Sequence, residues 1–152
     1  MKEKIGIKGS MYAKHTKPNG DVFEYRKDNL ILDTGFDFIC DALGKTADRP
    51  EALSFIALGI DDSTVSNDQT SLVNETGRVL ATYSHMSGTK SFALTSSFSA
   101  GVATGLIKEA GVCNNSVNGV FIDRVVLLPE NQINKEVDDI LSITFTFTFQ
   151  EG

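Results

Sequence analysis

Four charged residues stand in segments that are otherwise apolar, and they are the first candidates for a chemical role. They are Glu75, Arg78, Glu109 and Arg124. A buried charge without a partner is costly, so charges kept in such segments are normally paired. We expect Glu109 to form an ion pair with Arg124 or with Arg78. The alternative is that each side chain faces solvent on an outer strand face, and in both cases the role is structural.

Two histidines and two cysteines are the other residues that commonly bind metals or act as nucleophiles. His15 and His85 have no Cys, Asp or Glu at the spacing of metal ligands, and we expect both to be ordinary exposed side chains. Cys40 and Cys113 fit no metal or redox spacing, so we expect two reduced thiols that pack as small hydrophobes. These residues predict no catalytic group.

An acidic loop is the remaining candidate for ligand binding. Asp61, Asp62, Asn67 and Asp68 could gather oxygen ligands for Ca²⁺, but their spacing is not that of an EF-hand. A solvated acidic loop is therefore the favoured interpretation. The sequence also has no glycine-rich phosphate loop with its lysine and no Gly-x-Ser-x-Gly motif. We predict no metal, no cofactor and no enzymatic activity.

Aromatic and basic side chains interleave in the first 27 residues. They are Tyr12, Lys14, Lys17, Phe23, Tyr25, Arg26 and Lys27. Asn19-Gly20 accepts the positive φ angles of a tight turn, so residues 1–27 are predicted to form an N-terminal hairpin arm. Such an arm could be a nucleic-acid platform. A net charge of −6 argues against binding a phosphate backbone, so we expect contact with solvent or protein instead.

The segment 142–149 reads Ser-Ile-Thr-Phe-Thr-Phe-Thr-Phe and decides the fold class. Alternation with a period of two, built from β-branched and aromatic residues, is typical of a half-buried strand. It places Thr144, Thr146 and Thr148 on the outer face and the phenylalanines in a core. Further strands are expected over residues 5–13, 22–27, 53–58, 78–84, 91–98, 105–112 and 120–128. Residues 1–152 are predicted to form a single domain, mainly β, an antiparallel β-sandwich of seven or eight strands.

One or two short helices are expected near the front of the chain. Thr34 can cap a helix, with Asp37 completing a capping box, and Gly44 can end it. The apolar side chains expected to lie on the sheet are Phe36, Ile39, Cys40 and Leu43. Residues 69–75 can form one or two further helical turns.

Composition limits where the protein works. The chain is 41% hydrophobic and 22% charged, as in an ordinary globular protein. No run approaches the ~18–20 apolar residues needed to cross a bilayer, and the start has no apolar signal-peptide core. We therefore expect no membrane contact and synthesis in a cytoplasm.

Several short motifs follow one another in an order known from one group of proteins. They are Asn29-Leu30-Ile31-Leu32-Asp33-Thr34-Gly35, Ala57-Leu58-Gly59, Thr70-Ser71-Leu72-Val73-Asn74-Glu75 with Arg78, Glu109-Ala110-Gly111-Val112-Cys113, Arg124, and Lys135 with Leu141-Ser142-Ile143-Thr144-Phe145. Across residues 22–149 this order resembles small structural proteins encoded by tailed bacteriophages. The motif at Glu109 is also similar to the attachment modules of phage tail fibres.

The resemblance implies a non-enzymatic structural protein of the virion, made in the cytoplasm of the bacterial host. A tail or fibre-attachment component is favoured, and a capsid decoration protein on the head surface is the alternative. The expected partners are other virion proteins of the tail, neck, fibre or capsid. A carbohydrate- or ion-binding β-module that uses the 61–68 loop is a second alternative, weakened by the absence of Trp.

The uncharged face of the closing strand also predicts self-assembly. Exposed strand faces and edges without charge invite pairing with another chain. We expect a symmetric homo-oligomer, with a trimer as the favoured form. Its expected subunit contacts are Tyr12, Lys14, Phe23, Tyr25, Thr144, Thr146 and Thr148.

Overall fold

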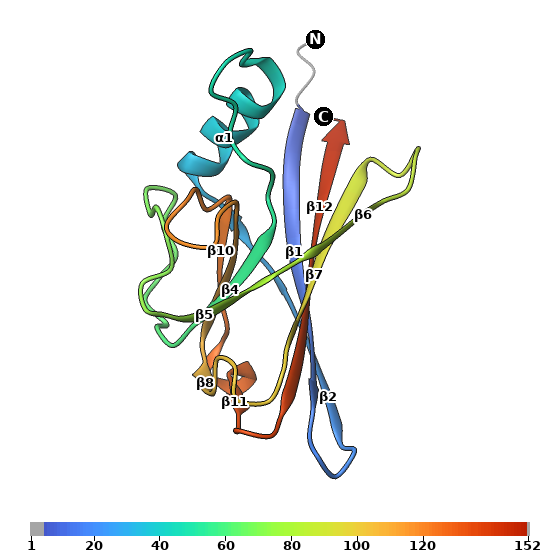
Figure 1. The fold of residues 1–152 in the computed structure, drawn as a ribbon, viewed down its shortest axis with the longest axis vertical. Coiled ribbons are helices and arrows are strands. Elements are labelled where there is room, and N and C mark those ends of the chain that lie inside the picture. The colour runs from blue at the N-terminus through green and yellow to red at the C-terminus, as the bar shows by residue number, and fades with distance from the viewer. Residues whose placement is uncertain (1–4, 152) are drawn as a thin grey trace.

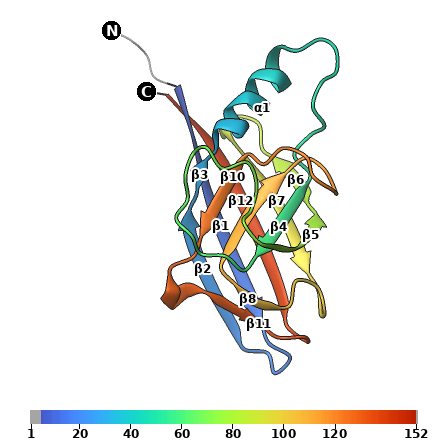
Figure 2. The same cartoon turned by 90° about the vertical axis from the view of Figure 1, so that its left-hand side faces the viewer.

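The computed structural model describes residues 5–151, and residues 1–4 and 152 lie outside the described part. Two five-stranded antiparallel sheets pack face to face (Figure 1, Figure 2). The first sheet has the order β2 (Val22–Asp28), β1 (Ile5–Thr16), β12 (Ile140–Glu151), β7 (Ser91–Phe98) and β6 (Thr82–His85). The second has the order β3 (Leu30–Ile31), β10 (Asp123–Val126), β9 (Glu109–Cys113), β4 (Phe55–Gly59) and β5 (Glu75–Leu80). The mainly β sandwich predicted from the sequence is confirmed.

Smaller elements lie at the two ends of the sandwich. The helix α1 (Asp33–Gly44) lies at the end of the sandwich where β1 begins and β12 ends (Figure 2). At the opposite end, β8 (Gly105–Ile107) pairs with β11 (Ile133–Lys135), close to the 3₁₀ helix Pro129–Asn131.

The closing strand β12 supplies the centre of the core. Ile143, Phe145 and Phe147 are each at most 1% exposed, and the threonines that alternate with them are partly exposed on the other face. Burying a side chain of this size contributes about 1.5–3 kcal/mol. Phe149 was expected in the core but is 40% exposed. At this end of the molecule β1 and β12 extend beyond the strands of the second sheet (Figure 2).

The hairpin predicted near the N-terminus is part of the first sheet. β1 pairs along its full length with β12 on one side, and from Ser10 to Thr16 it pairs with β2 on the other. The tight turn forms as predicted, because Lys17 N donates to Asp21 O at 2.8 Å and Gly20 has a φ of +94°. Residues 1–4 of the expected arm lie outside the described residues.

The strand predicted over residues 78–84 is divided between the two sheets. β5 lies at the edge of the second sheet and β6 at the edge of the first, and the chain passes from one to the other at Ala81 (Figure 1). Ala81 N donates to Ser54 O at 2.7 Å, and Ser96 Oγ donates to Val79 O at 3.1 Å. These tertiary hydrogen bonds hold the crossing in place.

The face that α1 buries matches the prediction only in part, because Ile39 packs against the core as expected but the other predicted side chains do not. Its buried residues are Gly35 and Phe38, whereas Phe36 is 48% and Leu43 is 80% exposed. A Cβ atom on residue 35 would lie 2.3 Å from Ile122 O. The missing side chain therefore lets the helix lie directly on the chain before β10, and this contact sets the rotation of the helix.

Three further local predictions are wrong. Thr34 does not cap the helix, because its Oγ1 donates to Phe121 O at 2.8 Å. Cys40 is exposed, and of the two thiols only Cys113 is buried. Residues 69–75 form no helix in the described chain, because a buried carboxylate binds their backbone N–H groups instead.

Candidate functional site

A buried ion pair lies on the outer face of the second sheet. Glu109 on β9 and Arg124 on β10 are both fully buried, and Arg124 Nε lies 3.2 Å from Glu109 Oε1. This is one of the two pairings predicted from the sequence. Ala110 and Val125, the next residues along these strands, belong to the core between the sheets. Because side chains alternate along a strand, the ion pair faces the other way.

Loop 60–74 covers this face and is held by the ion pair. The Glu109 carboxylate accepts hydrogen bonds from three backbone N–H groups of the loop. They belong to Val73 at 2.7 Å and to Asp61 and Asn74, each at 3.0 Å. Arg124 Nη1 donates to a backbone carbonyl of the same loop, that of Ser63, at 2.9 Å. Charge-assisted hydrogen bonds therefore fasten both ends of the loop to the sheet.

The other two charged residues hold a different loop. Glu75 and Arg78, both on β5, form a two-pronged ion pair with two N–O distances of 2.6 Å. Arg78 Nη1 also donates to Asn115 O at 2.7 Å and to Asn118 O at 2.9 Å. This guanidinium therefore fastens loop 114–119 to the second sheet, and it makes no pair with Glu109.

We call each ion pair together with the loop that it holds a clamp: Glu109–Arg124 with loop 60–74, and Glu75–Arg78 with loop 114–119. The buried thiol of Cys113 lies beside the second clamp, with Sγ 3.2 Å from Arg78 Nη1. Burial raises the pKa of the Cys113 thiol, and the nearby guanidinium only partly opposes that shift. Because the thiolate is the nucleophilic form, a raised pKa makes this cysteine unreactive near neutral pH.

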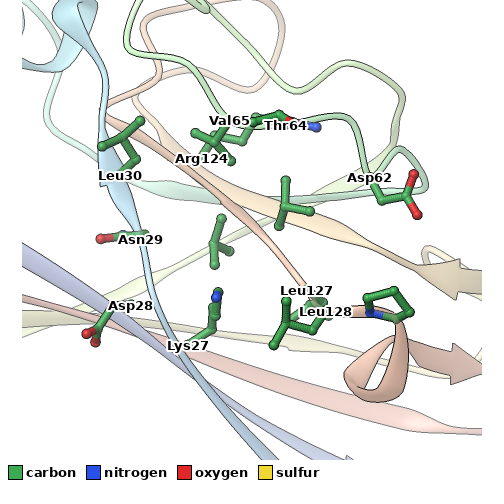
Figure 3. Close-up of a pocket in the computed structure, with 13 residues that line it drawn as sticks. Lys27, Asp28, Asn29, Leu30, Asp62, Thr64, Val65, Arg124, Leu127 and Leu128 are labelled. Carbon is green, nitrogen blue, oxygen red and sulfur yellow. The ribbon is translucent and has the colours of Figure 1, made fainter.

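A pocket of about 460 Å³ opens beside the first ion pair (Figure 3). Aliphatic side chains such as Leu30 and Val65 line it, and the carboxylates of Asp28 and Asp62 turn away from its centre. Arg124 forms part of the wall, but its guanidinium is already bound to loop 60–74 and to its carboxylate partner. Lys27 also lines the pocket, so its lining mixes aliphatic and charged side chains.

The acidic loop is bound to the protein's own groups. The Asp61 carboxylate accepts from Ser63 N at 2.8 Å and faces Arg124 Nη2 at 3.4 Å. Hydrogen bonds from Ser63 are the main cause that lowers the pKa of Asp61. Within residues 5–151, no three His, Cys, Asp or Glu side chains lie together as metal ligands. The geometry of the 61–68 loop gives no support to a Ca²⁺ site.

The predicted subunit contacts lie on two different faces of the first sheet. Tyr12 pairs with Thr144, and Lys14 lies in the next row of the same outer face. Thr146 and Thr148 continue that face. Phe23 and Tyr25 point to the other side of the sheet, where Phe23 is 46% exposed against His15 and Tyr25 packs on the core.

His15 was predicted to be exposed, but it is 4% exposed. Its Nε2 lies 2.7 Å from Asp139 Oδ2, which also accepts from Lys17 Nζ at 3.1 Å and from Glu136 N at 2.9 Å. The cluster ties the β1–β2 hairpin to the turn before β12. The signal was present in the sequence, because His15 continues the inward alternation of Met11 and Ala13. His85 is exposed, as predicted.

A further buried carboxyl group, that of Asp123, was not recognised from the sequence. It is fully buried on β10, accepts a hydrogen bond from Val112 N at 2.8 Å and contacts the side-chain amide of Asn29. Burial raises the pKa of Asp123 to about 8, and these hydrogen bonds only partly oppose the shift. The Asp123 carboxyl group therefore carries a proton at neutral pH, and it is enclosed by other protein groups with no exposure to solvent.

No helix in the described residues is both long enough and apolar enough to cross a bilayer. No protein-family model, no curated protein and no solved structure matches the chain.

Proposed function

We propose that the protein is a non-enzymatic structural component of a bacteriophage particle and acts through protein–protein contacts. It is made in the bacterial cytoplasm and built into the virion, with a tail or fibre-attachment position favoured over decoration of the capsid. The resemblance across residues 22–149 supports the assignment to a bacteriophage particle. The observation that carries the mode of action is the chemistry of the outer face of the first sheet.

Three neighbouring strands present short side chains without charge on this face. They are Ser142, Thr144, Thr146 and Thr148 on β12, Ser91, Ala93, Thr95 and Ser97 on β7, and Thr82 and Ser84 on β6. All are partly or fully exposed, and the Thr95 and Thr144 Oγ1 atoms lie 3.0 Å apart. Another protein can approach such a face closely without desolvating a charge, which is the expensive step in forming a polar interface.

The charged residues support the same interpretation. The charged groups of both clamps form hydrogen bonds with the backbone of the chain's own loops, so neither clamp offers a charged group to a substrate. The proposed partners are other virion proteins of the tail, neck, fibre or capsid. The net charge of −6 opposes a nucleic-acid backbone as partner. Assembly as a homo-oligomer, with a trimer favoured, is part of the proposal.

Mass spectrometry of particles purified from the phage that encodes the chain tests the proposal. The protein should be an integral component, and its copy number separates the two positions. A dozen copies or fewer correspond to the tail or neck, and hundreds correspond to capsid decoration. Absence of the protein from washed particles would overturn the proposal.

A pair of lysine substitutions tests the contact face. Thr146→Lys puts a charge in the middle of the neutral face, whereas Val73→Lys puts it at a 52% exposed position of loop 60–74. Both variants should keep the melting temperature of the wild type. Only Thr146→Lys should fail to enter particles. Equal incorporation of both variants would show that another surface makes the contact.

A further inference from the structure

The edge strands of the sandwich are protected unequally. An unprotected edge offers free backbone N–H and C=O groups to another strand, and proteins normally block such edges with charge or cover. The edge strand β2 carries four charged residues, which are Glu24, Arg26, Lys27 and Asp28. The edge strand β3 is covered, because Asn67 Nδ2 donates to Ile31 O at 3.1 Å.

The edge formed by β6 has no such protection. Within the described residues, β6 pairs only with β7, and all four of its residues are exposed. Residues 79–89 contain no Asp, Glu, Lys or Arg. Two large apolar side chains at this edge are open to solvent: Tyr83 is 62% and Met86, in the turn after β6, is 74% exposed. The opposite edge strand of the same sheet, β2, carries charge instead.

We propose that β6 pairs with β6 of a second copy of this chain, antiparallel and about a two-fold axis, so that the two first sheets become one continuous sheet. Two copies with a net charge of −6 each repel one another, and an edge without charged side chains adds nothing to that repulsion. An edge strand that meets its own copy in antiparallel orientation is automatically self-complementary, as a two-fold contact requires.

The side chains beside the edge are already ordered for such a contact. The Tyr83 ring lies 5.9 Å from Phe92, whose ring stacks on Phe147 at 5.2 Å. The Tyr83 ring is therefore supported by the core on one side and open to solvent on the other, and in the pair it packs across the axis with Met86. A four-residue edge buries less than the about 1,200 Å² of a stable interface, so the dimer dissociates on dilution.

This inference does not depend on the proposed function. It concerns the pairing of isolated chains through the lateral edge of the first sheet, whereas the trimer favoured above is an assembly within the particle through the outer face. Sedimentation equilibrium over a range of protein concentrations measures it on the isolated chain. The average mass of the wild type should rise from the 16.5 kDa of one chain toward twice that value as the protein concentration increases. A limiting mass of three chains, or a single-chain mass at every concentration, would overturn it.

Two matched variants test where the contact lies. Ser84→Lys places one charge on β6, and Val22→Lys places one at an exposed position of the opposite edge strand β2. Because the Ser84 side chain also belongs to the neutral outer face, Thr146→Lys on the same face but on the inner strand β12 is a further control and should dimerise as the wild type does. All three should keep the wild-type melting temperature. Ser84→Lys should remain a monomer, Val22→Lys should dimerise as the wild type does, and mixing Ser84→Lys with Ser84→Glu should restore the dimer. If Val22→Lys also blocks association, β6 pairs with β2 of the next copy and the two-fold proposal is wrong.

Discussion

Arg124 Nε lies 3.2 Å from Glu109 Oε1 at a point where both side chains are fully buried. Removing two charges from water is costly unless further hydrogen bonds satisfy them, and here the backbone of loop 60–74 supplies those bonds. The ion pair needs the loop, and the loop is ordered by the ion pair. Breaking either contact therefore affects both.

Replacing Glu109 with Gln should destabilise the protein by about 3–5 kcal/mol, because Arg124 would remain as a buried charge without its partner. The new amide NH₂ group also cannot accept the backbone N–H bonds of loop 60–74. Urea unfolding followed by circular dichroism measures the loss. Glu51→Gln, at an exposed position, is the control and should unfold as the wild type does. An unchanged midpoint for Glu109→Gln would mean that the ion pair does not stabilise the fold.

Replacing Arg78 with Lys should loosen loop 114–119. Lysine keeps the charge, but it cannot bind the Glu75 carboxylate with two prongs and also reach the two loop carbonyls. We expect a loss of about 1–3 kcal/mol and faster amide hydrogen exchange in this loop. Arg26→Lys, at an exposed guanidinium over the Tyr12 ring, should leave the loop unchanged. Identical exchange in both variants would contradict the clamp.

Regular alternation made the core strands predictable from sequence. In β12 the period of two is unbroken from Ser142 to Phe149, and it correctly predicts the buried face as far as Phe147. The same rule applied to β1 would have placed His15 with the inward residues Met11 and Ala13. The prediction of an exposed histidine was wrong because it relied on the polar character of the side chain and not on its position in the alternation. Its partner Asp139 lies 124 residues away, so no local pattern could indicate it.

Tertiary contacts decided the features that local patterns could not predict. The rotation of α1 depends on Gly35 lying against Ile122 O, a contact between segments far apart in the chain. The crossing at Ala81 depends on hydrogen bonds with Ser54 and with the β7 strand. Both charged clamps involve residues that the sequence analysis named, but their shared role of holding loops became visible only with the backbone groups in place.

Asp139 should make the protein sensitive to acid. Burial would raise the pKa of this carboxyl group, but hydrogen bonds from His15, from the Glu136 backbone and from Lys17 lower it to about 2, from 3.8 in the unfolded chain. Its contribution to stability is therefore fully present above about pH 4 and is lost as the pH falls from about 4 to about 2. Asp139→Asn should remove this dependence from urea midpoints measured between pH 2 and 6, while the exposed neighbour variant Asp138→Asn should retain it. If the urea midpoint falls equally with pH in both variants, other carboxyl groups cause the sensitivity to acid.

Asp123 should act in the opposite direction. Burial raises its pKa to about 8, from 3.8 in the unfolded chain. Between about pH 4 and pH 8 the folded protein keeps a proton that the unfolded chain releases. Stability should therefore fall as the pH rises through this range, by up to about 1.4 kcal/mol per pH unit.

The variant Asp123→Asn tests this dependence, because it keeps the shape of the side chain and stays neutral at every pH. Its oxygen can accept the hydrogen bond from Val112 N, and its NH₂ group can donate to Asn29 Oδ1, which is buried and has no partner among the described residues. We expect the variant to lose the slope between pH 4 and 8 and to exceed the wild type in stability at pH 8. Asp28→Asn, at an exposed position of β2, should keep the wild-type slope. A wild type whose urea midpoint is constant from pH 4 to 8 would show that Asp123 is ionised in the folded protein.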